Sequence, residues 1–172
     1  MENRLWNIFT NVNEWLKFAE SKNSILLAAD TGLGIGIYQL FLSRREWIFS
    51  WERICVSMVV ALLLAGAVIC LFSFLPNVKI PWLTTIQRPS DEDNVLFYGD
   101  IAKYAPERYL RLLYKRVGME WKDNAIEKDL AAEIIINSRI ALRKYRLFGI
   151  ALWMNFFALL VLCALILVEV TM

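Results

Sequence analysis

The sequence predicts an all-α, multi-pass membrane protein. It would have about three transmembrane helices, an N-terminal amphipathic helix and a helical cytoplasmic region continuous with the last transmembrane helix. Hydrophobic residues make up 58% of the 172 residues and are concentrated in long blocks, as in membrane proteins. Between the blocks, apolar residues recur with helical spacing, and no segment alternates as a β-strand would.

Residues 1–22 are predicted to form the amphipathic helix. Its apolar positions fall on one helical face. They are Leu5, Ile8, Phe9, Val12, Trp15, Leu16 and Ala19. A Trp-containing amphipathic helix suits a membrane interface, and it equally suits packing on the protein's own soluble part.

Residues 23–76 are predicted to form a transmembrane hairpin with spans at about 25–42 and 54–75. Asp30 interrupts the first span, where a carboxylate costs about 2.5–3.5 kcal/mol on insertion scales. Two interpretations remain open. Asp30 lies just inside the headgroups and bonds Thr31 or a backbone amide, or it is a polar element facing the inside of an oligomer.

Small residues in both spans favour close helix packing. Gly32 and Gly36 have the spacing that lets another helix approach, and Ala61 and Ala65 repeat it in the second span. Three spans in one protomer enclose little aqueous space, so we expect a homo-oligomer joined by these faces, with Asp30 as a candidate for its polar lining.

Residues 77–146 are predicted to form the cytoplasmic helical region. The Ser90–Asp93 run, S-D-E-D, is expected to cap a helix, because acids in a first turn complement the helix dipole. A further helix should follow Pro106 and end at Gly118, and the final helix should begin around Asp123.

The final helix carries a coiled-coil-like stripe in its polar half. The stripe consists of Leu130, Ile134, Asn137, Ala141, Tyr145 and Phe148. It is explained equally by self-association and by packing within the chain. Residues 147–172 then form the third transmembrane helix and a short tail, since the uncharged stretch Leu147–Val168 exceeds a hydrocarbon core of about 30 Å at about 1.5 Å per residue.

The distribution of positive charge predicts the topology. Most of the 19 Lys and Arg residues lie between Lys79 and Arg146, which places the N-terminus and residues 77–146 in the cytoplasm. Arg44, Arg45 and Arg53 oppose this orientation.

The composition argues against an enzyme. The chain has no His, which excludes His-based acid–base catalysis and most zinc sites. Cys55, Cys70 and Cys163 all lie in apolar stretches and are typical of packed side chains, so we expect no metal. The basic residues are scattered over helix faces beside lipid, so we expect no nucleic-acid partner.

Three segments in order carry a family resemblance. They are E-S-K-N-S-I-L-L-A-A-D before the first span, L-F-Y-G-D-I-A-K-Y in the middle and D-L-A-A-E-I-I-I-N-S-R-I-A-L-R-K-Y before the last span. This pattern resembles the transmembrane effectors of the Pycsar antiphage system (PycTM) over nearly the whole chain.

The resemblance implies a function. A companion pyrimidine nucleotide cyclase would make cCMP or cUMP on phage infection. The effector would respond by impairing the bacterial inner membrane, so that the cell dies before phage mature. No appended β-roll cyclic-nucleotide domain is visible in the sequence, so any nucleotide must bind the helical cytoplasmic region itself.

Such a site needs cations for the cyclic phosphate and flat groups for the pyrimidine. Phe97, Tyr98 and Tyr104 are candidates for stacking. Asp100 and Asn137 are candidates for reading base or sugar edges. Lys103, Arg139 and Lys144 are candidates for the phosphate. Ordinary helix packing explains the aromatic residues as well, and headgroup contact and solvation explain the cations.

Two other classes of protein fit the same sequence. A membrane-anchored adaptor would dock a partner protein on its cytoplasmic helices and would neither admit dye nor depolarise cells. A small transporter or channel subunit would conduct a substrate without toxicity.

Overall fold

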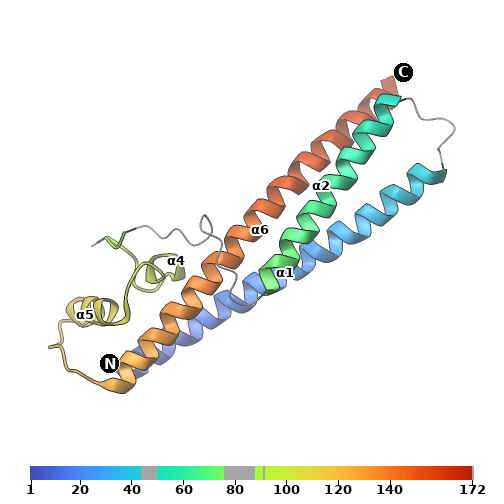
Figure 1. Cartoon of the computed structure of the whole chain (residues 1–172). Coiled ribbons are helices and arrows are strands. Elements are labelled where there is room, and N and C mark those ends of the chain that lie inside the picture. The colour runs from blue at the N-terminus through green and yellow to red at the C-terminus, as the bar shows by residue number, and fades with distance from the viewer. Residues whose placement is uncertain (44–49, 76–87, 91, 172) are drawn as a thin grey trace. The chain divides into compact units, whose positions relative to one another are not determined.

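The computed structural model describes residues 1–43, 50–75, 88–90 and 92–171. Its helices are α1 (Glu2–Ser43), α2 (Ser50–Phe74), α4 (Tyr98–Ile101), α5 (Pro106–Val117) and α6 (Ala125–Thr171), with no strand within these ranges. The chain divides into two compact units, and α1 and α6 contribute to both. Figure 1 shows the course of each helix.

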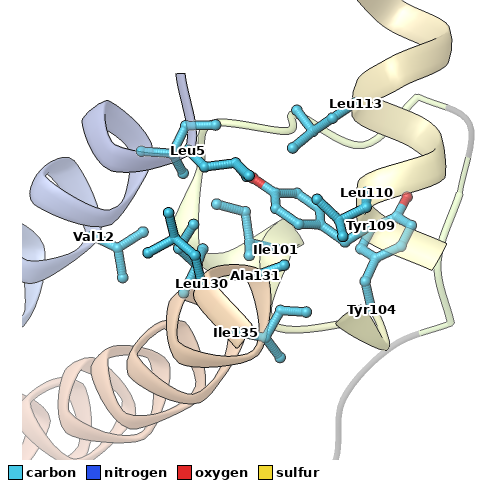
Figure 2. Close-up of a cluster of buried hydrophobic side chains, with 12 residues drawn as sticks. Leu5, Val12, Ile101, Tyr104, Tyr109, Leu110, Leu113, Leu130, Ala131 and Ile135 are labelled. Carbon is cyan, nitrogen blue, oxygen red and sulfur yellow. The ribbon is translucent and has the colours of Figure 1, made fainter. Parts of the chain in front are cut away.

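The first unit contains residues 1–20 and 78–146 and has a hydrophobic core. Leu5 and Val12 from α1 meet Leu110 from α5 and Ile134 from α6, and all four are fully buried. Figure 2 shows these elements converging around Ile101 and Tyr109. The Tyr109 hydroxyl donates to the carbonyl of Val95 at 2.7 Å, so the buried polar tip is satisfied.

In the first unit, α1 and α6 run parallel and are joined by two polar contacts. Asn137 Nδ2 donates to Asn13 Oδ1 at 2.9 Å, and Lys144 Nζ lies 3.1 Å from Glu20 Oε1. Both partners advance by one heptad between the contacts, which is the spacing that keeps two helices in register. Within the first unit, the stripe from Leu130 to Tyr145 and the apolar face of residues 1–20 therefore pack within the chain. Phe148, the last residue of the predicted stripe, belongs to the second unit.

Local sequence sets the limits of α5. Pro106 occupies its first turn, where the missing N–H costs nothing. Gly118 follows its last residue with φ 70°, a left-handed conformation that favours glycine, and its N–H bonds the carbonyl of Lys115. The predicted helix after Pro106 and its end at Gly118 are confirmed.

The second unit contains residues 21–77 and 147–172 and consists of segments of α1, α2 and α6 packed together. Asp30 lies near Gly66, whereas Ile37 packs near Val59, so α2 runs antiparallel to α1. Large apolar side chains face outward, and Ile25 is 70% exposed. Asn23, Asp30 and Ser73 are buried. This polar-inside, apolar-outside distribution suits a lipid solvent.

Two described helices are long and apolar enough to cross a membrane, by length and composition. They are the stretches Trp51–Phe74 and Ala125–Val168, which contain almost all of the predicted second span and the whole third span. Residues 25–42, the predicted first span, are not among them. The structure joins that span and the amphipathic helix in one uninterrupted helix, α1.

The prediction of a helix cap at Ser90–Asp93 is wrong. Residues 92–97 are turns and irregular structure, and the next helix, α4, begins at Tyr98. Asp93 instead accepts hydrogen bonds from the N–H of Ser90 at 2.8 Å and from the side chains of Lys103 and Tyr104. The carboxylate therefore stabilises the loop and α4 without capping a helix.

Candidate functional site

Lys103 is the centre of a charged cluster in the first unit. Its Nζ lies 2.6 Å from Asp100 Oδ1 and 2.7 Å from Asp93 Oδ1, and its side chain is only 12% exposed. The other oxygen of Asp100 accepts from the N–H of Asn94 at 3.0 Å. Two carboxylates thus surround one ammonium and hold α4 against the preceding loop.

The same contacts shift the pKa values of Lys103 and Asp93. Hydrogen bonds to Asp100 and Asp93 raise the pKa of Lys103, although burial opposes the shift. Burial raises the pKa of Asp93, but bonds from Lys103, Ser90 and Tyr104 outweigh it and leave that pKa below its ordinary value. Both groups are therefore charged across the physiological pH range.

Arg139 of α6 binds the main chain after α4. Its Nε donates to the carbonyl of Ala102 and its Nη2 to the carbonyl of Tyr104, each at 3.0 Å. A planar guanidinium suits two such acceptors because its donors form a fixed fork. Residues 102–104, here called the Lys103 segment, are therefore hydrogen-bonded directly to α6 through Arg139.

Aromatic rings gather beside α4. The rings of Tyr98 and Tyr145 stack with centroids 5.1 Å apart, and Trp15 lies 5.5 Å from Tyr98. Burial, followed by the proximity of Tyr145, raises the pKa of Tyr98 to about 12. Phe97 contacts Tyr98 at 4.6 Å but is 41% exposed. Of the predicted stacking residues, Phe97 has the most accessible ring, whereas Tyr98 and Tyr104 are buried.

The predicted ligand-binding residues divide into two groups. Phe97, Tyr98, Asp100, Lys103 and Arg139 lie together around α4. Asn137 and Lys144 face α1, where they contact Asn13 and Glu20. The structure therefore does not bring all seven into one cluster, and their role in binding stays a prediction.

A second polar cluster lies inside the second unit. Asp30 of α1 is 1% exposed. A Cβ added to Gly66 of α2 would lie 2.7 Å from Asp30 Oδ2 and 3.2 Å from Asn155 Nδ2 of α6. Three helices thus bring a carboxyl, an amide and a glycine to one point, and only glycine at position 66 leaves room for the two side chains.

The small-residue faces remain open. A Cβ at Gly32 or Gly36 would meet nothing within 4 Å. Ala61 is exposed and Ala65 partly buried. These positions are compatible with another helix approaching, and their role in self-association stays a prediction.

Sequence reasoning missed several partners. Asn155 in the second unit was not singled out, and the tertiary neighbours of Gly66, Glu20 and Asp93 were not predicted. Asn155 had a detectable signal, because an amide within an apolar span has to find a polar partner. No local pattern distinguishes Gly66 from other small residues, since its neighbours come from distant helices. Among the described residues, no group of three Cys, Asp or Glu side chains is placed to hold a metal ion.

These observations define a class of protein: an all-helical chain with a hydrophobic-cored unit and an apolar-surfaced unit, two of whose helices are suited to a membrane. Residues 4–170 match the family described as Pycsar effector protein domain, and the chain belongs to that family. It is 29% identical over 154 residues to Pycsar effector protein PtPycTM of Propioniciclava tarda, covering 87% of this chain and 68% of that protein. No solved structure matches the chain.

Proposed function

We propose that this protein is a non-enzymatic antiphage effector of the bacterial inner membrane. It responds to a cyclic pyrimidine nucleotide, cCMP or cUMP, made by a companion cyclase, and it impairs the membrane so that infection aborts. Membership of the Pycsar effector family supports this function. The outward-facing apolar side chains of the second unit support a membrane location.

In this proposal the nucleotide binds the first unit beside α4. Phe97 offers an accessible ring for the base, and Lys103 and Arg139 offer cations within the same group of residues. The cyclic phosphate competes with the carboxylates of Asp93 and Asp100 for Lys103. If the phosphate replaced these carboxylates, the ion pairs that link Lys103 to Asp93 and Asp100 would be lost. Ligand binding would then favour one arrangement of the helices over another.

The observation that carries the proposal is the direct attachment of the Lys103 segment to α6 through Arg139. The helix α6 is uninterrupted from Ala125 to Thr171 and includes an apolar stretch suited to a membrane. An event at Lys103 therefore has a continuous helical connection to the part of the chain that would act on lipid. We propose three spans, with 25–42 as the first, and a cytoplasmic location for the N-terminus and residues 77–146.

Substitution of the two cations tests the binding site. Lys103→Ala and Arg139→Ala should abolish nucleotide-dependent toxicity and depolarisation while leaving membrane insertion unchanged. The matched control is Lys115→Ala, which removes an exposed cation of α5 outside the predicted site. Calorimetric titration of the purified variants with cCMP and cUMP measures binding separately from toxicity.

A folding defect has to be distinguished from a binding defect, because both cations also hold the first unit together. Arg139→Lys keeps the positive charge but loses the fork that binds two carbonyls. If the charge acts on phosphate, Arg139→Lys should retain measurable nucleotide affinity. Full toxicity in both alanine variants rejects the assignment. Dye exclusion and normal polarisation in cells making wild-type protein and cyclic nucleotide would favour an adaptor.

A further inference from the structure

We infer that Asp30 binds a proton in the closed arrangement of the second unit, and that loss of this proton to water favours an open, leaky arrangement. The group assigned here is a buried carboxyl that neither the family nor the relative assigns. The inference shares with the proposed function only the membrane location of the second unit.

The first observation is the isolation of the carboxyl. Asp30 is 1% exposed, and within the described part of the chain neither of its oxygens has a hydrogen-bond partner of acceptable distance and angle. The amide of Asn155 lies at weak hydrogen-bonding range of Asp30, and its Nδ2 also donates to the carbonyl of Ala151 at 3.0 Å. The adjacent Thr31 does not compensate, because its hydroxyl bonds the carbonyl of Leu27.

The second observation is the absence of a compensating cation among the described residues. Asp30 makes no ion pair there. The groups close to it are Gly66 and the thiol of Cys70 from α2, and the amide of Asn155 from α6. None of them carries positive charge. An isolated ionised carboxylate in an apolar interior costs far more than a neutral acid, so the closed arrangement selects the protonated form.

The third observation is the close packing around the carboxyl. Gly66 allows the Asp30 and Asn155 side chains to approach α2, and an added Cβ would lie 2.7 Å from Asp30 Oδ2. A neutral acid fits this position without solvent. When the three helices separate and water reaches the carboxyl, its proton passes to water and the resulting carboxylate resists return to the interior. Deprotonation and opening therefore favour each other.

Infrared spectroscopy tests the protonation directly. The full chain is reconstituted in phosphatidylcholine vesicles without nucleotide, and the spectrum of Asp30→Asn is subtracted from that of the wild type between pH 5 and pH 9. We expect the difference to show the C=O stretch of a protonated carboxyl at neutral pH. Glu52→Gln, which removes a carboxyl group of α2, is the matched control, and its spectrum should retain the band assigned to Asp30. Carboxylate bands for Asp30 at pH 7 would overturn the inference.

Dye leak from the same vesicles tests the coupling to opening. A gate coupled to one deprotonation should give a leak that rises with pH by up to about tenfold per unit. Asp30→Asn, which keeps the shape but cannot ionise, should remain tight over the whole range, and Glu52→Gln should behave as wild type. A wild-type leak that does not change with pH, or a pH-dependent leak in Asp30→Asn, contradicts the inference. Because no nucleotide is present, failure here leaves nucleotide binding by the first unit untouched.

Discussion

Asp93 shows how one side chain takes part in several contacts at the residue scale. It receives hydrogen bonds from Ser90, Lys103 and Tyr104 and is 6% exposed. The sequence marked it as part of an acidic run, and that pattern correctly indicated a structural role. It did not indicate the donors Lys103 and Tyr104, because they lie ten and eleven residues further along the chain.

The lowered pKa of Asp93 predicts sensitivity to acid. The stability that Asp93 contributes is complete above its unfolded value of 3.8 and is lost as the pH falls through its lower folded value. Asp93→Asn should lower the free energy of unfolding by about 1–3 kcal/mol at pH 7 and weaken its dependence on pH below 4. Chemical denaturation in detergent, followed by Tyr and Trp fluorescence, measures both, and an unchanged acid profile would contradict the assignment.

Gly66 gives a second prediction at the residue scale. Gly66→Ala places a methyl group against Asp30 and Asn155, so we expect destabilisation by about 1–3 kcal/mol despite the better helix propensity of alanine. At Gly34 an added Cβ meets nothing within 4 Å, so Gly34→Ala should be neutral or stabilising by about 0.5–1 kcal/mol. Thermal unfolding in detergent compares the two, and equal effects would show that the site has room to relax.

At the element scale, α6 is the helix on which both units depend. Its polar half packs against α1, α4 and α5, and its apolar half belongs to the second unit. Sequence periodicity predicted this continuity well, because no Pro interrupts residues 125–171 and the transition from polar to apolar is abrupt. It predicted α1 less well, since Asp30 and the glycines weakened the apolar signal of residues 25–42 without breaking the helix.

Gly149 allows the continuity of α6 to be tested. It lies within the helix, and an added Cβ meets nothing within 4 Å. Gly149→Pro removes a backbone hydrogen bond and clashes with the preceding turn at a cost of about 3 kcal/mol, whereas Gly149→Ala adds helix propensity. We expect the proline variant to bind nucleotide with wild-type affinity but to lose nucleotide-dependent depolarisation by at least about tenfold.

The alanine variant is the control for that experiment and should signal as well as the wild type. Calorimetry of the purified proteins and depolarisation of intact cells provide the two measurements. If Gly149→Pro signals normally, coupling does not depend on an intact α6.

At the scale of the whole molecule, the division into two units follows from solvent preference. The first unit buries apolar side chains such as Ile101 and Ile134. The second unit exposes large apolar side chains such as Ile25 and buries the polar residues Asn23, Asp30 and Ser73. Hydropathy alone predicts this contrast, because it depends on composition. The arrangement of the candidate binding residues was harder to predict. Lys103 and Arg139 contact residues distant in the sequence, and such contacts produce no periodic pattern in the sequence.

Self-association belongs to the same scale. Gly32→Leu and Ala61→Leu fill surfaces that are open in the protomer, so they should disrupt a homo-oligomer without unfolding it. We expect a lower mass in sedimentation measurements and at least about tenfold less membrane damage. Ile25→Leu, a change at a highly exposed apolar position, is the control. Unchanged mass in both leucine variants would remove these faces from the interface.

The order of the buried polar residues along the chain affects how the protein is made. Asp30 emerges from the ribosome early, whereas Gly66 and Asn155, which surround it in the finished structure, follow much later. Until these residues have been synthesised, transfer of the Asp30 carboxyl from water or from the translocation machinery into lipid is energetically unfavourable. Integration of the segment around Asp30 should therefore be complete only after α6 has been synthesised.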